Sequence, residues 1–300
     1  MELWIPITLT AAFAQTIRTA IQRQMKGPLG DYGASAIRFI YAIPFAWLWF
    51  FIVFTNSDDP FPMPSAISVG WLFVGGIAQI IFTVLLVKLF SYRNFLVGIA
   101  FSKTEVLFAA IFEAVILAAV INLQFGMAIF LGTLAVVILS FSGKSFSIGE
   151  FAIGLRSQAT LIGILCGIAL AGSVLGFRAA INSLPEAGFL VRATTGAALA
   201  VVGQSILVCL YLFIYRRDEL VAALRLWKVG LAAGFFAAIS TACWFSAFAL
   251  QLAAPVRAVG QAEIVFTTVI TIFVFKQKIS RLEVIGILLL LSSILLVIYN

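Results

Sequence analysis

Polar and charged side chains lie inside long apolar stretches of this chain, where such residues are uncommon. Gln15, Arg18 and Gln22 are spaced three and then four residues apart, so that on a helix they form one polar stripe. Lys103 and Glu105 lie two positions apart in another stretch, and on a helix they would point about 200° away from each other. Side chains of these types predict solute binding or proton exchange inside a membrane.

A buried carboxylate beside an arginine can exchange protons near neutral pH, as a proton-coupled carrier requires. Because Lys103 and Glu105 point apart, each is expected to find its partner on another helix. We expect Arg18 or Arg38 to neutralise Glu105. The alternative is a set of purely structural buried ion pairs, which would carry no protons.

Cations outnumber carboxylates inside the apolar stretches, and arginine binds carboxylates and phosphates through paired N–H donors. An anionic or zwitterionic solute therefore fits these stretches better than a lipophilic cation. Glu263 is expected to lie opposite Arg178 or Arg192. The candidate substrate-binding or coupling residues are Gln15, Arg18, Gln22, Arg38, Lys103, Glu105, Arg178, Asn182, Arg192, Gln261 and Glu263.

The sequence gives little support for enzyme activity. The chain has no histidine, which removes histidine–metal sites and the Ser-His and Cys-His nucleophile pairs. No G-x-x-x-x-G-K-S/T motif occurs, so this chain by itself is not expected to use ATP. We therefore expect no enzyme activity, no metal and no cofactor.

The elements that must position the polar residues are apolar stretches long enough to cross a membrane. Hydrophobic residues make up 63% of the chain and charged residues 10%, against about 25% charged residues in a soluble domain. A soluble fold could not cover its core with so few charges. We predict an all-α polytopic membrane protein with about ten transmembrane helices. The predicted spans are 4–24, 33–55, 68–90, 95–119, 123–142, 160–181, 187–214, 228–250, 255–275 and 283–299.

The net charge of +7 is explained by topology rather than by nucleic-acid binding. Basic residues concentrate in alternate loops, and the other loops hold residues such as Asp58 and Asp59 with no Lys or Arg. By the positive-inside rule the basic loops are cytoplasmic, so that both termini face the other side of the membrane. We expect a small-molecule substrate, protons as a candidate coupling ion, membrane lipids, no nucleic acid, and a monomer or weak homodimer.

The two halves of the chain resemble each other. Charged residues are rare in the apolar stretches, so that their alignment is stronger evidence of a repeat than matches between Ile and Leu. The aligned charged pairs are Glu105 with Glu263, Arg18 with Arg178, and Arg38 with Arg192. We predict a first five-helix repeat over 1–143, a connecting loop over 144–159 and a second five-helix repeat over 160–300.

An odd number of spans in each half places the second half upside down relative to the first. Inverted repeats supply the two alternating faces of many secondary transporters, with the substrate site between them near the membrane midplane. The pattern therefore predicts a secondary carrier that works by alternating access. A channel or a lipid scramblase is the alternative, because a polar groove would also explain the buried charges.

Each half has a polar first helix and an arginine early in its second helix, and the stretch 274–286 (VFKQKISRLEVIG) runs from the ninth span into the tenth. In these features the chain resembles the EamA-type ten-helix permeases of the drug/metabolite transporter superfamily. The resemblance implies secondary transport, often export, of metabolites such as amino acids, nucleobases, sugar phosphates or vitamins, in a bacterial inner membrane. Many relatives are cytoplasmic at both termini, whereas the charges here predict the reverse.

Local features also predict packing and anchoring. Pro44 removes a backbone donor and is expected to kink the second span. Arg23 and Lys26 are expected to reach the lipid headgroups with their long side chains. Pairs of glycines four residues apart predict close approach of helices within the chain. These pairs are Gly163 and Gly167, Gly172 and Gly176, and Gly230 and Gly234.

Overall fold

The computed structural model describes residues 2–93, 95–108, 111, 123–140, 157–185, 187–251, 256 and 259–298, and its regular structure there is helical. Most of the expected connecting loop, 144–159, lies outside the described residues. The helices are α1 (Trp4–Ile40), α2 (Ile43–Thr55), α3 (Ala66–Leu89), α4 (Phe95–Ser102), α6 (Leu123–Ser140), α8 (Gln158–Asn182), α9 (Phe189–Tyr215), α10 (Arg217–Arg225), α11 (Trp227–Leu250), α13 (Ala262–Phe273) and α14 (Arg281–Ile298).

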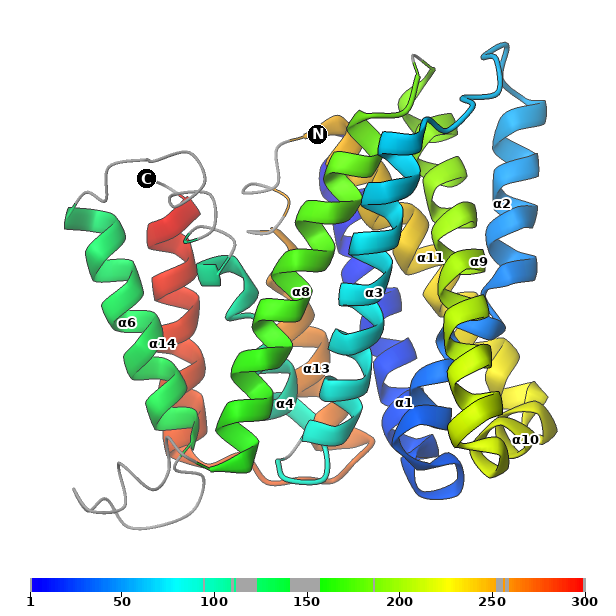
Figure 1. Cartoon of the computed structure of the whole chain (residues 1–300). Helices are drawn as coiled ribbons and strands as arrows, with labels where there is room; N and C mark the ends of the chain where they lie inside the picture. Colours follow the sequence, from blue (N-terminus) through cyan, green and yellow to red (C-terminus); the bar gives the residue numbers. More distant parts are fainter. Residues whose placement is uncertain are drawn as a thin grey trace.

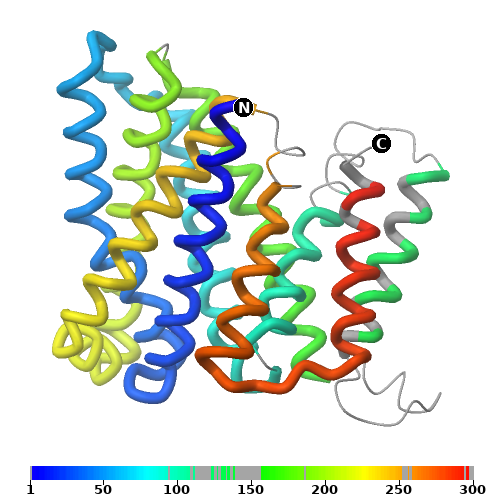
Figure 2. Tube along the Cα trace, turned by 180° about the vertical axis from the view of Figure 1, so that it is seen from behind, coloured from blue at the N-terminus to red at the C-terminus, as the bar shows by residue number. Residues whose placement is uncertain are grey.

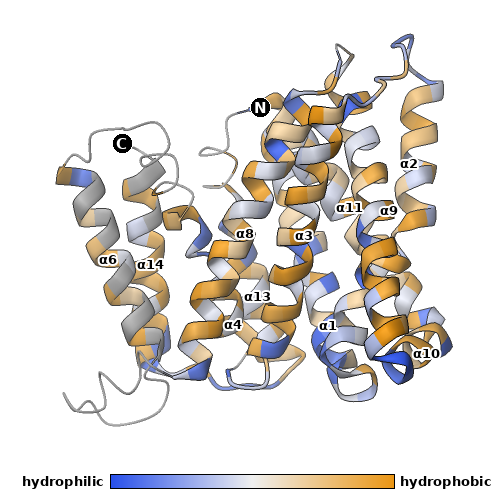
Figure 3. Cartoon of the chain, viewed as in Figure 1, coloured by the Kyte–Doolittle hydropathy of each residue, from blue (hydrophilic) through white to orange (hydrophobic). Residues whose placement is uncertain are grey.

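Several helices are long and apolar enough to cross a membrane. Within the described residues, five stretches meet this condition, namely the run from α1 through α2 (Trp4–Thr55), α3, α8, α9 and α11. Large apolar side chains such as Phe51 and Phe213 are each 53% exposed on the outside of the bundle. Hydrophobic colour runs along the helices in Figure 3, and hydrophilic colour gathers mainly at their ends. The chain is therefore an all-helical membrane protein whose outer surface suits lipid.

The helices lie side by side in one bundle (Figures 1 and 2). The most extensive packing joins α3 to α8, α1 to α11, and α6 to α14. The start of α1 and the end of α14 lie at the same end of the bundle (Figure 1). Helices from the first and second halves of the sequence thus pack against each other throughout the molecule.

The first long helix turns back on itself. Its backbone leaves helical geometry at Gly30, whose φ of 69° suits a residue without a side chain. Pro28 lies just before this bend. The side-chain amide of Gln22, before the bend, donates to the carbonyl oxygen of Ala34, after the bend, at 3.1 Å. The first two predicted spans therefore form a hairpin whose connection is itself largely helical, where a polar loop was expected.

The predicted kink at Pro44 is confirmed. The helical run is interrupted at Tyr41 and Ala42, between the end of α1 and the start of α2. Proline cannot donate a backbone hydrogen bond to the carbonyl one turn earlier, and its ring crowds that carbonyl. A Cβ atom on Gly234 would meet the backbone of Tyr41, so that only glycine lets α11 approach the break this closely.

Close packing at glycines holds elsewhere in the bundle. A Cβ atom on Gly176 of α8 would lie 2.8 Å from the Cα atom of Gly75 of α3, and a Cβ atom on Gly163 would lie 2.5 Å from the Phe101 ring. Gly172 has its nearest such contact at 3.7 Å, from Ala78. The predicted close approach within the chain is confirmed at Gly163 and Gly176, and Gly172 takes little part in it.

Candidate functional site

The polar stripe of the first helix faces the interior of the bundle. Arg18 and Gln22 are 2% and 1% exposed, and Gln15 is half-buried. Phe13, on the opposite side of the helix, is 50% exposed. The helix thus turns its polar side toward α11 and α13 and its apolar side outward, as the periodicity predicts.

A buried polar cluster joins four elements. The Lys103 ammonium and the Glu263 carboxylate form an ion pair, with both side chains at most 2% exposed. The Gln15 amide of α1 donates to the same carboxylate at 2.8 Å. Trp244 of α11 in turn donates its indole N–H to the Gln15 side-chain oxygen at 3.0 Å. The cluster therefore connects Trp244, Gln15, Glu263 and Lys103 in a continuous chain of charge-assisted and neutral hydrogen bonds.

Two helices are interrupted at this cluster. Helix α4 ends at Ser102 and helical structure resumes at Glu105, while α13 begins at Ala262 after a turn at Gln261. These ends lie part-way along the length of the neighbouring helices (Figure 1). The predicted continuous span over 95–119 is thus broken at Lys103, and its residues beyond 108, except 111, lie outside the described part of the chain.

The two interruptions have the same local geometry. The N–H of Val106 donates to the carbonyl oxygen of Lys103 at 3.3 Å, and the N–H of Ile264 donates to that of Gln261 at 2.9 Å. Each bond spans three residues, which is the tighter 3₁₀ pattern, and each lies directly at a glutamate. Glu105, which lies at the first interruption, is 2% exposed. The positions that correspond in the two halves of the sequence therefore adopt corresponding backbone structures.

The partner expected for Glu263 was wrong. Its carboxylate is bound by Lys103 and Gln15, not by Arg178 or Arg192. Helix α8 ends at Asn182, only four residues beyond Arg178, so that Arg178 lies in the last turns of its helix and is half-buried. The helix that carries Arg18 continues to its bend at Gly30, which leaves Arg18 deep in the bundle.

Three predicted residues accordingly lie away from the central cluster. Arg178 and Arg192 are half-buried, and Asn182 is exposed at the end of α8. Arg192 lies in the first turn of α9, on the other side of the short connection from Asn182. The structure does not bring these three residues together with Glu263, because the connection between α8 and α9 lies at an end of the bundle (Figure 1).

The two buried arginines of α1 hydrogen-bond hydroxyl groups. Arg18 donates from Nη2 to the Thr19 hydroxyl at 3.2 Å, and Arg38 donates from Nη1 to the Thr83 hydroxyl of α3 at 3.2 Å. Neither guanidinium hydrogen-bonds Glu105. The carboxylate whose charge acts on Arg18 is that of Glu263. The two arginines thus lie beside the Lys103–Glu263 pair without sharing a carboxylate through hydrogen bonds.

Arg23, which was expected to reach the headgroups, is half-buried and packs on aromatic rings. Its guanidinium carbon lies 3.9 Å from the centroid of the Phe275 ring and 5.4 Å from that of Phe95. The Phe95 and Phe275 rings are themselves in contact, with centroids 5.0 Å apart. Arg23 therefore links the first arm of α1 to the start of α4 and to the residues just after α13 by cation–π contact. Lys26, the other residue expected at the headgroups, forms an ion pair with Asp31.

Sequence reasoning missed two acidic residues that cap helices of the opposite half. The Glu219 carboxylate of α10 accepts hydrogen bonds from the N–H groups of Tyr32 at 3.0 Å and Gly33 at 2.7 Å. The Asp59 carboxylate, between α2 and α3, accepts one from the N–H of Gly188 at 2.9 Å, at the start of α9. Carboxylates are favoured at helix N-termini, where backbone donors are otherwise unpaired.

These two caps lie at opposite ends of the bundle (Figure 1). Each joins the connection between two long helices of one half of the sequence to the start of a helical segment in the other half. Acidic residues in loops were visible in the sequence, but nothing local in the sequence indicates which distant helix they reach. Each cap therefore closes one end of the seam between the halves.

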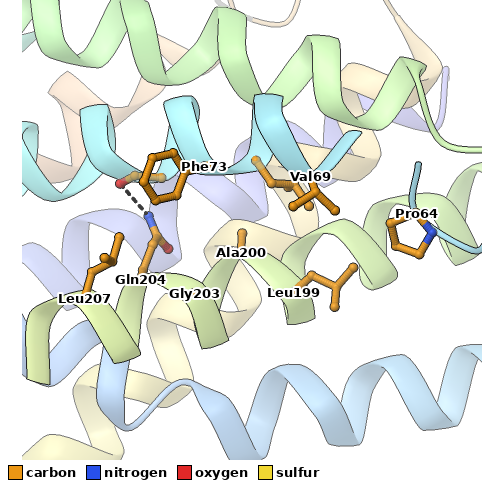
Figure 4. A pocket seen from close by; sticks show the side chains of 10 residues that line it. Pro64, Val69, Phe73, Leu199, Ala200, Gly203, Gln204 and Leu207 are labelled. Carbon is orange, nitrogen blue, oxygen red and sulfur yellow. Dashed lines mark hydrogen bonds between the residues drawn. The ribbon is translucent and has the colours of Figure 1, made fainter. Parts of the chain in front are cut away.

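A groove opens on the side of the bundle, between α3 and α9. It has a volume of about 240 Å³ and an apolar lining that includes Val69, Phe73 and Leu207 (Figure 4). At its floor the Gln204 amide donates to the carbonyl oxygen of Gly76 at 3.3 Å, the bond drawn in Figure 4. Because Val69 and Phe73 are more than half exposed on the outer surface, this groove faces outward and is separate from the central cluster.

A capping box lies at the start of α14. The N–H of Ser280 donates to the Glu283 carboxylate at 2.7 Å, and the N–H of Glu283 donates to the Ser280 hydroxyl at 3.2 Å, which is a capping box. Burial lowers the pKa of Arg93, and the nearby Glu283 charge offsets part of that effect. Glu283 therefore has a structural role at the end of the bundle, apart from the central cluster.

Comparison with known proteins shows the fold and leaves the activity open. No family model and no curated protein matches the sequence. A solved chain described only as "Crystal structure of protein" matches over 98% of this chain and 95% of its own length, with a TM-score of 0.62 and 14% sequence identity. The arrangement of helices along nearly the whole chain is thus shared with another protein.

Proposed function

We propose that this chain is a secondary carrier of small molecules, which works by alternating access between two inverted halves. The observation that carries the proposal is the pair of matched helix interruptions at Glu105 and Glu263. In a membrane, irregular backbone is tolerated only where it is buried in protein or lines a cavity. Interrupted helices at corresponding positions of two repeats are typical of the substrate sites of transporters.

The packing of the helices supports two halves related by a two-fold axis. Under the repeat, α1 corresponds to α8 and α3 corresponds to α11. The packing of α1 on α11 is then equivalent to that of α8 on α3, and these are among the most extensive contacts in the bundle. We infer ten spans in two inverted five-helix repeats.

The acidic caps at the two ends support alternating access. Glu219, in the connection between α9 and α11, and Asp59, in the corresponding connection between α2 and α3, each cap the start of a helical segment in the other half. Opening a pathway toward one side of the membrane requires the halves to separate at that end. We infer that one cap releases while the other holds, which gives the carrier its two access states.

We also propose a family, an orientation in the membrane and a substrate class. The resemblance to EamA-type permeases of the drug/metabolite transporter superfamily favours export of a metabolite from a bacterium. The end of the bundle that carries α10 holds Arg216, Arg217 and Arg225, so that the positive-inside rule assigns it to the cytoplasm. The buried arginines favour an amino acid or another anionic or zwitterionic substrate.

The test is solute counterflow in proteoliposomes. Purified protein is first screened by ligand-induced thermal shift against amino acids, nucleosides, vitamins and sugar phosphates, and the solute that stabilises it is then used in exchange assays. A carrier gives saturable uptake that increases when the same solute is present inside the vesicles. A variant of an exposed residue, Asp218→Asn, serves as a control for the assay and is expected to exchange the solute as the parent protein does. Unsaturable flux without stimulation by internal solute would instead identify a channel, and lipid movement alone a scramblase.

A further inference from the structure

Two buried arginines lie on the two arms of the first helical hairpin. Arg18 precedes the bend at Gly30 and Arg38 follows it, and their side chains are 2% and 3% exposed. The two arms are in contact, since the Gln22 amide of the first donates to the carbonyl oxygen of Ala34 in the second at 3.1 Å, and the charge of Arg18 acts on Arg38. Two like charges are therefore buried on the facing arms of one hairpin, an arrangement that is unfavourable unless an anion compensates it.

The hydrogen bonds of these arginines leave most of their donors unused. A guanidinium has five N–H donors and no acceptor. Arg18 donates to the Thr19 hydroxyl and Arg38 to the Thr83 hydroxyl, each at 3.2 Å. The Nε atom of each arginine is buried without a hydrogen-bond partner. Both acceptors are neutral, so the bonds that are made do not balance either positive charge.

No carboxylate of the described residues hydrogen-bonds either arginine. Glu263 is the acid whose charge acts on Arg18, but its carboxylate already binds the Lys103 ammonium and the Gln15 amide. The charged residues at most 3% exposed around the central cluster are Arg18, Arg38, Lys103, Glu105 and Glu263. Three cations against two carboxylates leave one positive charge in excess among these residues.

We propose that Arg18 and Arg38 together bind the carboxylate of a solute that carries a single negative charge. This assignment rests on the proposed function and names the class of substrate. One carboxylate supplies the missing negative charge, and its two oxygens match the paired N–H donors of a guanidinium. A phosphate group at about −1.5 to −2 would exceed the excess charge. The Lys103–Glu263 pair then lies beside the bound carboxylate and does not bind it.

The test measures binding to purified full-length protein in detergent, independently of transport. The probes are lactate and benzoate as monocarboxylates, inorganic phosphate as the competing oxyanion, and chloride at equal ionic strength. Lactate or benzoate should raise the apparent melting temperature in a saturable manner, and phosphate and chloride should not. Arg18→Gln and Arg38→Gln should each weaken this binding by about 10- to 100-fold, because a hydrogen-bonded charge is lost.

The stability of the unliganded variants separates binding from a structural role. If these arginines bind a ligand at a cost to stability, then Arg38→Gln should melt at the same or a higher temperature than the parent protein. A residue that serves only packing would give a lower melting temperature. Arg38→Lys keeps the positive charge but lacks the planar guanidinium with its paired N–H donors, and it should also lose binding. Exposed Arg225→Gln is the matched control and should keep it.

Each outcome decides the assignment. Saturation by phosphate in place of monocarboxylates, no saturable stabilisation by either anion, or binding that survives Arg18→Gln and Arg38→Gln would each overturn it. Counterflow assays on the same preparations separate the two proposals. Carboxylate binding without exchange upholds the anion site and contradicts the carrier, whereas exchange that is unaffected in both arginine variants upholds the carrier and contradicts the anion site.

Discussion

Lys103 and Glu263 form a buried ion pair across 160 positions of the sequence. Lys103 lies where α4 is interrupted, and Glu263 lies in the first turn of α13. The pair thus joins the two interrupted helices to each other. A buried ion pair of this kind contributes little to stability compared with an apolar pair of the same shape, but loss of one partner leaves an uncompensated charge.

This relationship predicts a strong coupling between the two residues. Lys103→Met and Glu263→Gln alone are each expected to destabilise the protein by about 3–5 kcal/mol, because each leaves the other charge buried without its partner. The double variant should recover most of that loss. Apparent melting temperatures of the purified proteins measure the coupling in a double-mutant cycle. Additive losses in the double variant would show that the two side chains do not interact.

The glutamates at the helix interruptions predict the pH dependence of transport. If Glu105 or Glu263 carries the coupled proton, then Glu105→Gln or Glu263→Gln should make uptake independent of the pH gradient, since glutamine cannot release a proton. Uptake into proteoliposomes with and without an imposed pH gradient is the measurement. Correct insertion of each variant is checked by its elution as a monodisperse species. An unchanged response to pH in both variants would remove these residues from a coupling role.

The cap formed by Glu219 predicts a local change in backbone protection. Glu219→Ala removes the acceptor for the N–H groups of Tyr32 and Gly33, so that hydrogen exchange of these amides should accelerate. The lost cap is expected to cost about 0.5–2 kcal/mol. Exposed Asp218→Ala, one position away, should leave the exchange unchanged. Hydrogen–deuterium exchange of a peptide covering both amides measures the effect.

The same experiment applies at the opposite end of the bundle. Asp59→Ala should accelerate exchange at Gly188, and exposed Asp58→Ala should not. If the caps release alternately, each variant should affect the amides at its own end and leave those at the other end protected. Equal acceleration at both ends in either variant would contradict independent caps.

The bend at Gly30 predicts a difference between two neighbouring glycines. Gly30→Ala should destabilise the protein by at least about 1–2 kcal/mol, because the backbone there has a positive φ that disfavours a side chain. A Cβ atom would also lie 2.7 Å from the Glu219 carboxyl carbon. Gly27→Ala should be neutral, since a Cβ atom there has nothing within 4 Å. Thermal unfolding of the two variants tests the prediction, and equal stability would show that the bend tolerates alanine.

Features that depend on local pattern could be predicted from the sequence. The spacing of Gln15, Arg18 and Gln22 predicted the inward-facing stripe, because the helical period alone determines which residues share a face. Pro44 predicted the break before α2, because the missing N–H and the ring act on the adjacent turn. The partner of Glu263 could not be predicted in this way, since several buried cations were available on other helices.

The sequence by itself determined that this protein is helical, that its outer surface suits lipid and that polar side chains face inward, because composition and periodicity act through burial and backbone geometry within a few turns. Only the tertiary structure decided that Lys103 pairs with Glu263, that Arg178 and Asn182 lie at an end of the bundle, and that Glu219 caps the second arm of the first hairpin. Those contacts join residues far apart in the chain, so they depend on where each helix ends and which helix it packs against.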